Sequence, residues 1–106
     1  MKIAISSTGN RPDSPIDKSF GRCAWFVIYD SDNRSVEYIP NPFRDQLENS
    51  GISAVQFLEQ KGIRKLVSGD FGIKVKTLID TLRIQMIVIR DIKYTVNQII
   101  ELLNHN

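Results

Sequence analysis

The second half of the chain alternates between helical apolar spacing and a nearly continuous apolar run. Residues 75–82 carry Val, Leu, Ile and Leu at positions i, i+3, i+4 and i+7, which places these side chains on one face of a helix. Residues 96–103 repeat the spacing, and Thr95 stands where a helix N-cap is expected. The run 84–89 between them is typical of a strand that helices bury on both faces. This alternation predicts an α/β fold.

The first half of the chain adds strands and one helix. Residues 25–29 and 35–39 are rich in aromatic and β-branched side chains, and the polar turn between them predicts a hairpin. Further elements are expected as strands at 3–5 and 64–67 and as a helix at 51–61 that Gly62 ends. Right-handed crossovers between the later strands then give a three-layer α/β/α fold with a five-stranded mixed sheet.

Length and composition exclude several classes of protein. The 106 residues suffice for one hydrophobic core, so residues 1–106 are expected to form a single domain. The chain has 14 Lys and Arg residues and 12 Asp and Glu residues. This nearly neutral balance does not predict a large basic surface that binds nucleic acid. No apolar run approaches the roughly 20 residues that span a membrane. Residues 1–6 enter a strand pattern directly, without the apolar run of a signal peptide, so a cytoplasmic location is expected.

A ligand site is expected at one edge of the sheet. Ligands of open α/β sheets collect outside the carboxyl ends of the strands, where neighbouring loops diverge. Three loops are expected to meet there, at residues 6–20, 69–72 and 90–91. The first hairpin strand runs antiparallel to the opening strand, so its start brings Arg22 and Cys23 to the same edge.

Several residues at this edge suit an anionic ligand. Gly69 and Gly72 let the backbone approach a ligand closely, and the helix after them presents unpaired N–H groups. Lys74 lies in the first turn of that helix, and Ser7 and Thr8 offer hydroxyl donors. The alternative is that the glycines and hydroxyls only shape turns, since the chain has neither a phosphate-loop lysine nor GxGxxG.

Cys23 is the only cysteine in the chain. Arg22 beside it favours the thiolate, which is the form that binds soft metals. The chain has no CxxC, and its one histidine, His105, is the penultimate residue, so a zinc site closed by protein ligands alone is not expected. A single ligand can still hold a preassembled cluster. The alternative is that Cys23 is a small buried hydrophobe.

Patterns for catalysis are weak. The chain has no GxSxG elbow, and a hydrolase triad would depend on the tail histidine. Asp13, Asp17, Asp70 and Asp91 lie in loops of the expected site edge, but the opening strand lacks the carboxylate that a two-metal nuclease needs. Loop carboxylates of this kind are typical turn formers and helix caps. The sequence therefore predicts a protein that is not an enzyme.

Short motifs follow one another in a fixed order along the whole chain. They are Met1-Lys2-Ile3-Ala4-Ile5, Asp13-Ser14-Pro15-Ile16, Phe20-Gly21-Arg22-Cys23, Asn41-Pro42, Gly51, Gly62-Ile63, Gly69-Asp70-Phe71-Gly72-Ile73-Lys74 and Thr95-Val96. In order and spacing these motifs resemble those of the dinitrogenase iron-molybdenum cofactor biosynthesis family.

The resemblance implies a ribonuclease H-like fold and the binding or carriage of an iron-sulfur or iron-molybdenum cluster during cofactor assembly, rather than catalysis. Members of the family often carry histidine before the Phe-Gly-Arg motif and before the glycine that opens the first helix. This chain has Ser19 and Ser50 at those positions. The resemblance therefore leaves Cys23 as the remaining soft ligand.

The leading hypothesis is a non-enzymatic carrier of a metal cluster or its precursor. In this hypothesis Cys23 ligates metal, while Arg22 and Lys74 offset negative charge. Hydroxyl and amide contacts would come from Ser7, Thr8, Gly69 and Gly72. The alternative is a protein-interaction module that keeps the scaffold, has lost the metal site, and contacts a partner in cofactor assembly through a surface that includes Trp25.

Overall fold

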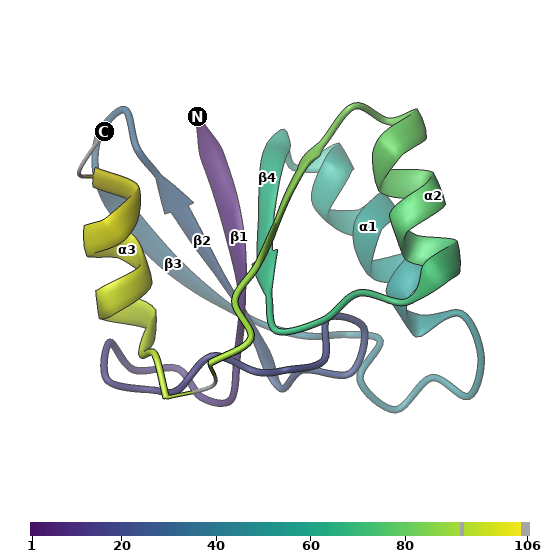
Figure 1. Ribbon diagram of the computed structural model, residues 1–106, viewed down its shortest axis with the longest axis horizontal. Helices are drawn as coiled ribbons and strands as arrows, with labels where there is room; N and C mark the ends of the chain where they lie inside the picture. Colours follow the sequence, from purple (N-terminus) through teal and green to yellow (C-terminus); the bar gives the residue numbers. More distant parts are fainter. Residues whose placement is uncertain (92, 105–106) are drawn as a thin grey trace.

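A computed structural model describes residues 1–91 and 93–104 of the protein. The strands are β1 (Lys2–Ser7), β2 (Trp25–Asp30), β3 (Ser35–Pro40), β4 (Ile63–Ser68) and β5 (Gln85–Val88), and the helices are α1 (Ser50–Gln60), α2 (Ile73–Thr81) and α3 (Val96–Asn104). The five strands form one sheet in the order β3-β2-β1-β4-β5 (Figure 1). In this sheet β1 pairs parallel with β4 and β4 with β5, whereas β2 runs antiparallel to both of its neighbours. The predicted mixed sheet is confirmed.

The helices cover both faces of the sheet. In Figure 1, α1 and α2 lie on one side and α3 lies on the other. Alternate residues along each strand point to opposite faces, so Ala4 packs toward α1 and α2 while Ile5 packs toward α3. The two resulting clusters of buried side chains form the core, and the three-layer arrangement that the sequence predicts is confirmed. In the described part of the chain no helix has the length and hydropathy to cross a membrane.

The prediction for the run at 84–89 is only partly correct. The strand β5 forms there, but its residues 86–88 are half-buried rather than enclosed on both faces. The reason is its position at the edge of the sheet, because β5 pairs with β4 alone. Only Ile84, just before the strand, is fully buried.

Two helix ends match the sequence signals. Gly62 follows α1 with a φ of 82°, a left-handed conformation that glycine adopts without steric cost. Thr95 caps α3 through its Oγ1, which accepts a hydrogen bond from Gln98 N at 3.2 Å, while Gln98 Oε1 accepts one from Thr95 N at 2.9 Å. This reciprocal pair is a capping box.

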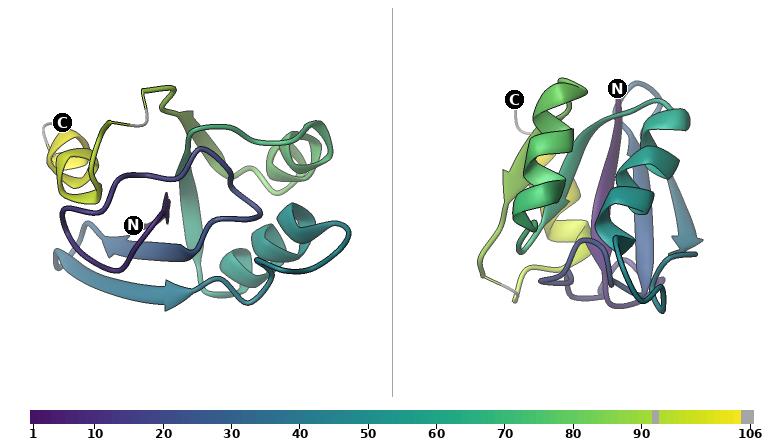
Figure 2. Two further views of the ribbon diagram at one scale, coloured as in Figure 1. Left: turned by 90° about the horizontal axis from the view of Figure 1, so that it is seen from below. Right: turned by 90° about the vertical axis from the view of Figure 1, so that its right-hand side faces the viewer.

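The long segment after β1 crosses the carboxyl edge of the sheet. Isolated bridges pair Pro15 with Thr95 on one side and Ser19 with Asp70 on the other. The left view of Figure 2 shows this segment, in purple to blue, running from α3 toward α1 and α2. Its course brings residues 18–22 against the ends of other elements, and that contact forms the candidate site.

Candidate functional site

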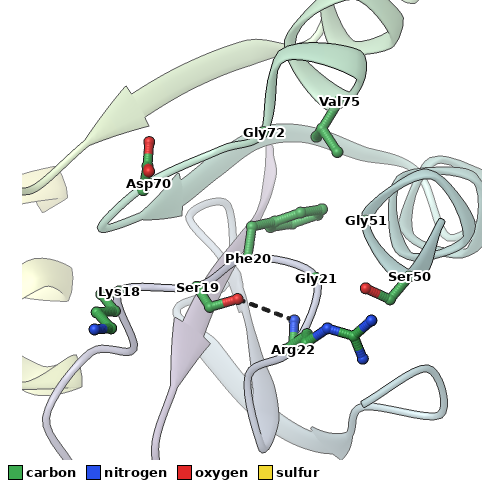
Figure 3. A pocket seen from close by; sticks show the side chains of 10 residues that line it. All are labelled: Lys18, Ser19, Phe20, Gly21, Arg22, Ser50, Gly51, Asp70, Gly72 and Val75. Carbon is green, nitrogen blue, oxygen red and sulfur yellow. Dashed lines mark hydrogen bonds between the residues drawn. The ribbon is translucent and has the colours of Figure 1, made fainter. Parts of the chain in front are cut away.

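A cavity of about 470 Å³ lies where residues 18–22 meet the starts of α1 and α2 (Figure 3). It is lined by Lys18, Ser19, Phe20, Gly21, Arg22, Ser50, Gly51, Asp70, Gly72 and Val75. A second hollow of about 340 Å³ shares Ser50, Gly51, Gly72 and Val75 with the first and adds Ile73 and Lys74. The two hollows therefore form one depression across both helix starts, which we call the helix-start cavity.

Two glycines allow the three segments of the cavity to come together. A Cβ atom on Gly21 would lie 2.6 Å from Gly51 N and 2.8 Å from Ser50 Oγ. A Cβ atom on Gly51 would overlap Val75 Cγ2 at the start of α2. Both positions therefore need glycine for close packing, and the turn at 20–22 rests directly on the first residues of α1.

Neither helix start at the cavity has a side-chain cap. Asn49 before α1 and Gly72 before α2 make no side-chain capping hydrogen bond, and neither first turn contains an acidic residue. In α1 the first backbone hydrogen bond is donated by Ser53 N to Asn49 O, and in α2 it is donated by Lys76 N to Gly72 O. The amides of residues 50–52 and 73–75 therefore have no intrahelical acceptor. Two positive helix-dipole ends converge on one cavity.

Charged side chains around the cavity are mainly basic. Lys18 and Arg22 line the larger hollow and Lys74 the smaller one, while Asp70 is the one acidic residue lining either. The Arg22 guanidinium donates hydrogen bonds to the carbonyls of Arg44 at 3.1 Å and Leu47 at 3.2 Å. In Figure 3 the Asp70 carboxylate points away from Gly21 and Ser50, and Asp70 Oδ1 accepts a hydrogen bond from Phe71 N. The cavity is thus electropositive at the helix starts.

The two serines that mark this chain's departure from the family pattern both line the cavity. Ser19 Oγ accepts a hydrogen bond from Arg22 N at 3.2 Å, which holds the turn at 20–22 (Figure 3). Ser50 is 7% exposed, and its hydroxyl points toward the Gly21 turn. These two positions, 31 residues apart in the sequence, therefore line the same cavity.

Three of the predicted binding residues lie at the cavity. Arg22 and Gly72 line the larger hollow, and Lys74 lines the smaller one. Gly69 does not line either hollow, because a Cβ there would lie 2.5 Å from Lys18 Cα, so its role is to let the crossing segment pack on the end of β4.

The predicted hydroxyl contacts from Ser7 and Thr8 are not at the cavity. Ser7 is buried, and its Oγ donates to Gly9 O at 2.6 Å. Thr8 Oγ1 donates to Pro15 O at 2.8 Å. Both hydroxyls satisfy backbone groups of the crossing segment, which is the turn chemistry that formed the alternative interpretation.

Cys23, the predicted metal ligand, does not face the helix-start cavity and is buried, as in the alternative interpretation. Cys23 is 0% exposed, and its Sγ donates a hydrogen bond to Phe20 O at 3.3 Å. Burial, and secondarily the negative charge of Asp17, raises the pKa of the thiol to about 12. The thiol is therefore protonated at neutral pH, which disfavours metal ligation, and Arg22 points its charge toward the loop carbonyls.

Other parts of the predicted site edge lie elsewhere. Asp91, from the loop predicted at 90–91, lines a separate polar hollow with Lys93, Tyr94 and Gln98. Of the four loop carboxylates considered for a nuclease, only Asp70 lines the helix-start cavity. Within residues 1–91 and 93–104, no three His, Cys, Asp or Glu side chains are grouped so that they could hold a metal ion. His105 lies outside the described residues.

Several cavity residues had no predicted ligand role. Lys18 and Val75 carry no motif that marks a site, and Ser50 and Gly51 stood out only as the positions where the family pattern has histidine and the glycine that opens the first helix. The one available signal is that both Asn49-Ser50-Gly51 and Gly69-Asp70-Phe71-Gly72 open helices whose first turns lack Asp and Glu. That signal indicates two helix N-termini that favour negative charge. It does not indicate that the two N-termini lie close together in the fold.

Comparison with known proteins identifies the family of the chain. The family model described as dinitrogenase iron-molybdenum cofactor matches residues 1–105. The chain belongs to this family. No curated protein matches the sequence.

Solved structures share the fold of this family member. The apo form of the orange protein from Desulfovibrio gigas is 29% identical, with a TM-score of 0.87 over 96% of this chain and 85% of that one. A Thermotoga protein described as a candidate NifB protein is 25% identical, with a TM-score of 0.82 over 99% and 88%. A candidate dinitrogenase from Methanocaldococcus jannaschii, 21% identical with a TM-score of 0.54 over 81% and 72%, shares the fold.

Proposed function

We propose that this protein is a cytoplasmic, non-catalytic carrier that binds an anionic metal-containing cluster, or a precursor of one, in the helix-start cavity during cofactor assembly. The observation that carries the proposal is the convergence of two uncapped helix N-termini on a cavity bordered by Lys18, Arg22 and Lys74. Free amides and positive dipole ends stabilise negative charge.

The cavity would hold such a cargo by hydrogen bonds and charge. Its lining offers hydroxyls, amides and cations, and it contains neither a thiolate nor an imidazole among the described residues. The cargo must therefore bring its own complete set of metal ligands. Cys23 has no part in this mechanism, because its protonated thiol lies in the core.

The family and the similar structures support a cargo of this class. The family model is named for the iron-molybdenum cofactor of dinitrogenase, and one similar structure is an apo form, a term used for a protein without its ligand. The single carboxylate in the lining supports a carrier over a hydrolytic enzyme, since metal-dependent cleavage needs several converging acids.

Anaerobic reconstitution with iron, molybdate and sulfide tests the proposal. The wild-type protein should take up a visible chromophore that survives gel filtration, and Cys23→Ala should retain it. Lys74→Glu should lower the uptake several-fold, whereas Lys76→Glu should leave it unchanged, because both lysines are exposed on α2 but only Lys74 lines the cavity. Absence of uptake by the wild type, or equal loss in both lysine variants, would contradict the proposal.

A second candidate function is a protein-interaction module. Two large apolar side chains are almost fully exposed near the cavity: Leu47, at 92%, lies in the loop that Arg22 holds, and Ile73, at 83%, lines the smaller hollow. Exposed apolar groups beside a ligand site suit contact with a recipient protein. If this function holds without any cargo, the double variant Leu47→Ser, Ile73→Ser should lose binding to a cofactor-assembly protein in a pull-down, and no chromophore should form on the wild type.

A further inference from the structure

Ser50 is a largely buried residue that lines the helix-start cavity. The residue is 93% buried, since only 7% of its surface is exposed, and it lines both hollows of the cavity. Among residues 1–91 and 93–104, the one fully enclosed side-chain oxygen without a hydrogen-bond partner is Ser6 Oγ, on β1. Ser50 Oγ is not enclosed in this way, and no side-chain hydrogen bond of the described residues involves it, whereas its neighbour Ser53 Oγ accepts one from Gln46 Nε2 at 3.0 Å. A hydroxyl that lines a cavity and that no group of the described chain engages is available to donate to a ligand there.

The groups around Ser50 Oγ are also donors. The amides of residues 50–52 open the same helix, and residues 73–75, whose amides also lack an intrahelical acceptor, line the smaller hollow at the start of α2. All are hard N–H or O–H donors, which bind oxygen acceptors strongly when the acceptor is charged. Several donors converging from two directions match an ion that carries acceptor oxygens on more than one side.

We infer that the helix-start cavity binds a tetrahedral oxyanion of the molybdate, sulfate and phosphate class, with Ser50 Oγ as the side-chain donor that selects it. This inference rests on the proposed function, since it names the chemical class of one cargo of that site. It differs from cluster carriage because the ion is small, bears only oxygen on its surface and needs no coordination by the protein. Lys18 and Lys74 add positive charge at the two ends of the depression.

Isothermal titration of the full chain with sodium molybdate, sulfate and phosphate, each in dilute chloride buffer, tests the inference. The wild type should bind at least one of these ions saturably. Ser50→Ala should weaken the binding about tenfold or more, because a hydrogen bond to a charged group contributes about that factor. Ser50→Asp should abolish binding, since it places a negative charge at the helix start. Ser53→Ala is the matched control and should bind as the wild type does.

Amide chemical shifts of the wild-type protein provide a readout that does not depend on a variant folding. Addition of molybdate should shift the amide resonances of residues 50–52 and 73–75, while an equal ionic strength of chloride should not. Tighter binding of molybdate than of phosphate and sulfate would identify a metal oxyanion as the cargo. Equal binding of all three would support the general oxyanion class.

The outcomes separate this inference from the proposed function. If the protein takes up a reconstituted cluster but shows neither titration heat nor amide shifts with the three ions, the inference is wrong and the carrier proposal stands. If the ions bind through Ser50 but no cluster is taken up, the carrier proposal is wrong and the oxyanion site stands. Equal affinity of Ser50→Ala and the wild type would remove Ser50 from the site and overturn the inference.

Discussion

Replacing Gly21 by alanine should destabilise the protein by about 1–3 kcal/mol, the usual cost of inserting a methyl group into a well-packed site. The new Cβ would lie 2.6 Å from Gly51 N and 2.8 Å from Gly51 Cα. Both are backbone atoms at the start of α1, so no rotamer change can remove the overlap. The turn at 20–22 must then move away from α1, which should also weaken ligand binding in the helix-start cavity.

Gly72→Ala is the matched comparison. Gly72 lines the same cavity, has a φ of −66° that alanine adopts easily, and has no atom within 4 Å of its would-be Cβ. This variant should change stability by less than about 1 kcal/mol, because alanine lowers the entropy of the unfolded chain but is a poorer helix N-cap than glycine.

Urea denaturation with a fluorescence or circular dichroism readout measures both changes. Gly21→Ala should lower the midpoint without changing the slope, which would show an altered stability with the same surface exposed on unfolding. At about 4–8 °C per kcal/mol for a domain near this size, its melting temperature should fall by several degrees at least. Equal stability of Gly21→Ala and the wild type would show that the turn does not rest on α1, and an equal loss in Gly72→Ala would show that crowding is not the cause.

Three further predictions concern groups in the core and at a helix end. The native Cys23 thiol should resist alkylation at pH 8 and react after unfolding. Because the folded state raises the pKa of this thiol from 9.0 to about 12, its contribution to stability should be constant below pH 9 and be lost between pH 9 and about 12. Cys23→Ala should therefore reduce the loss of stability over that range in pH-dependent urea titrations. Asn41→Ala should cost about 1–3 kcal/mol, since Asn41 Nδ2 donates to Gly21 O at 3.0 Å and Cys23 O at 2.9 Å, and an unchanged urea midpoint would contradict this role. Thr95→Ala should cost about 0.5–2 kcal/mol through loss of the α3 cap, measured by thermal melting with Thr77→Ala, an exposed helical threonine, as the control.

The sequence predicted a ligand site at the carboxyl edge of the sheet, and three of the residues named for it line the helix-start cavity at that edge. Arg22, Gly72 and Lys74 lie at the cavity because each belongs to an element end that the topology brings to one edge. Ser7 and Cys23 are at the same edge but face inward. The local sequence gives no rule for which way a side chain points in a loop or just before a strand, so this part of the site could not be predicted.

The elements themselves were determined by short stretches of sequence. Helical spacing at 75–82 and 96–103, the left-handed glycine after α1 and the cap at Thr95 each act within a few residues, so the sequence alone specifies them. The tertiary structure alone decided that β5 lies at an edge and that Gly21 packs on Gly51. It also placed Ser50 in a shared cavity and Cys23 in the core. These outcomes depend on contacts between residues far apart in the chain, which the packing of the whole sheet and its helices decides.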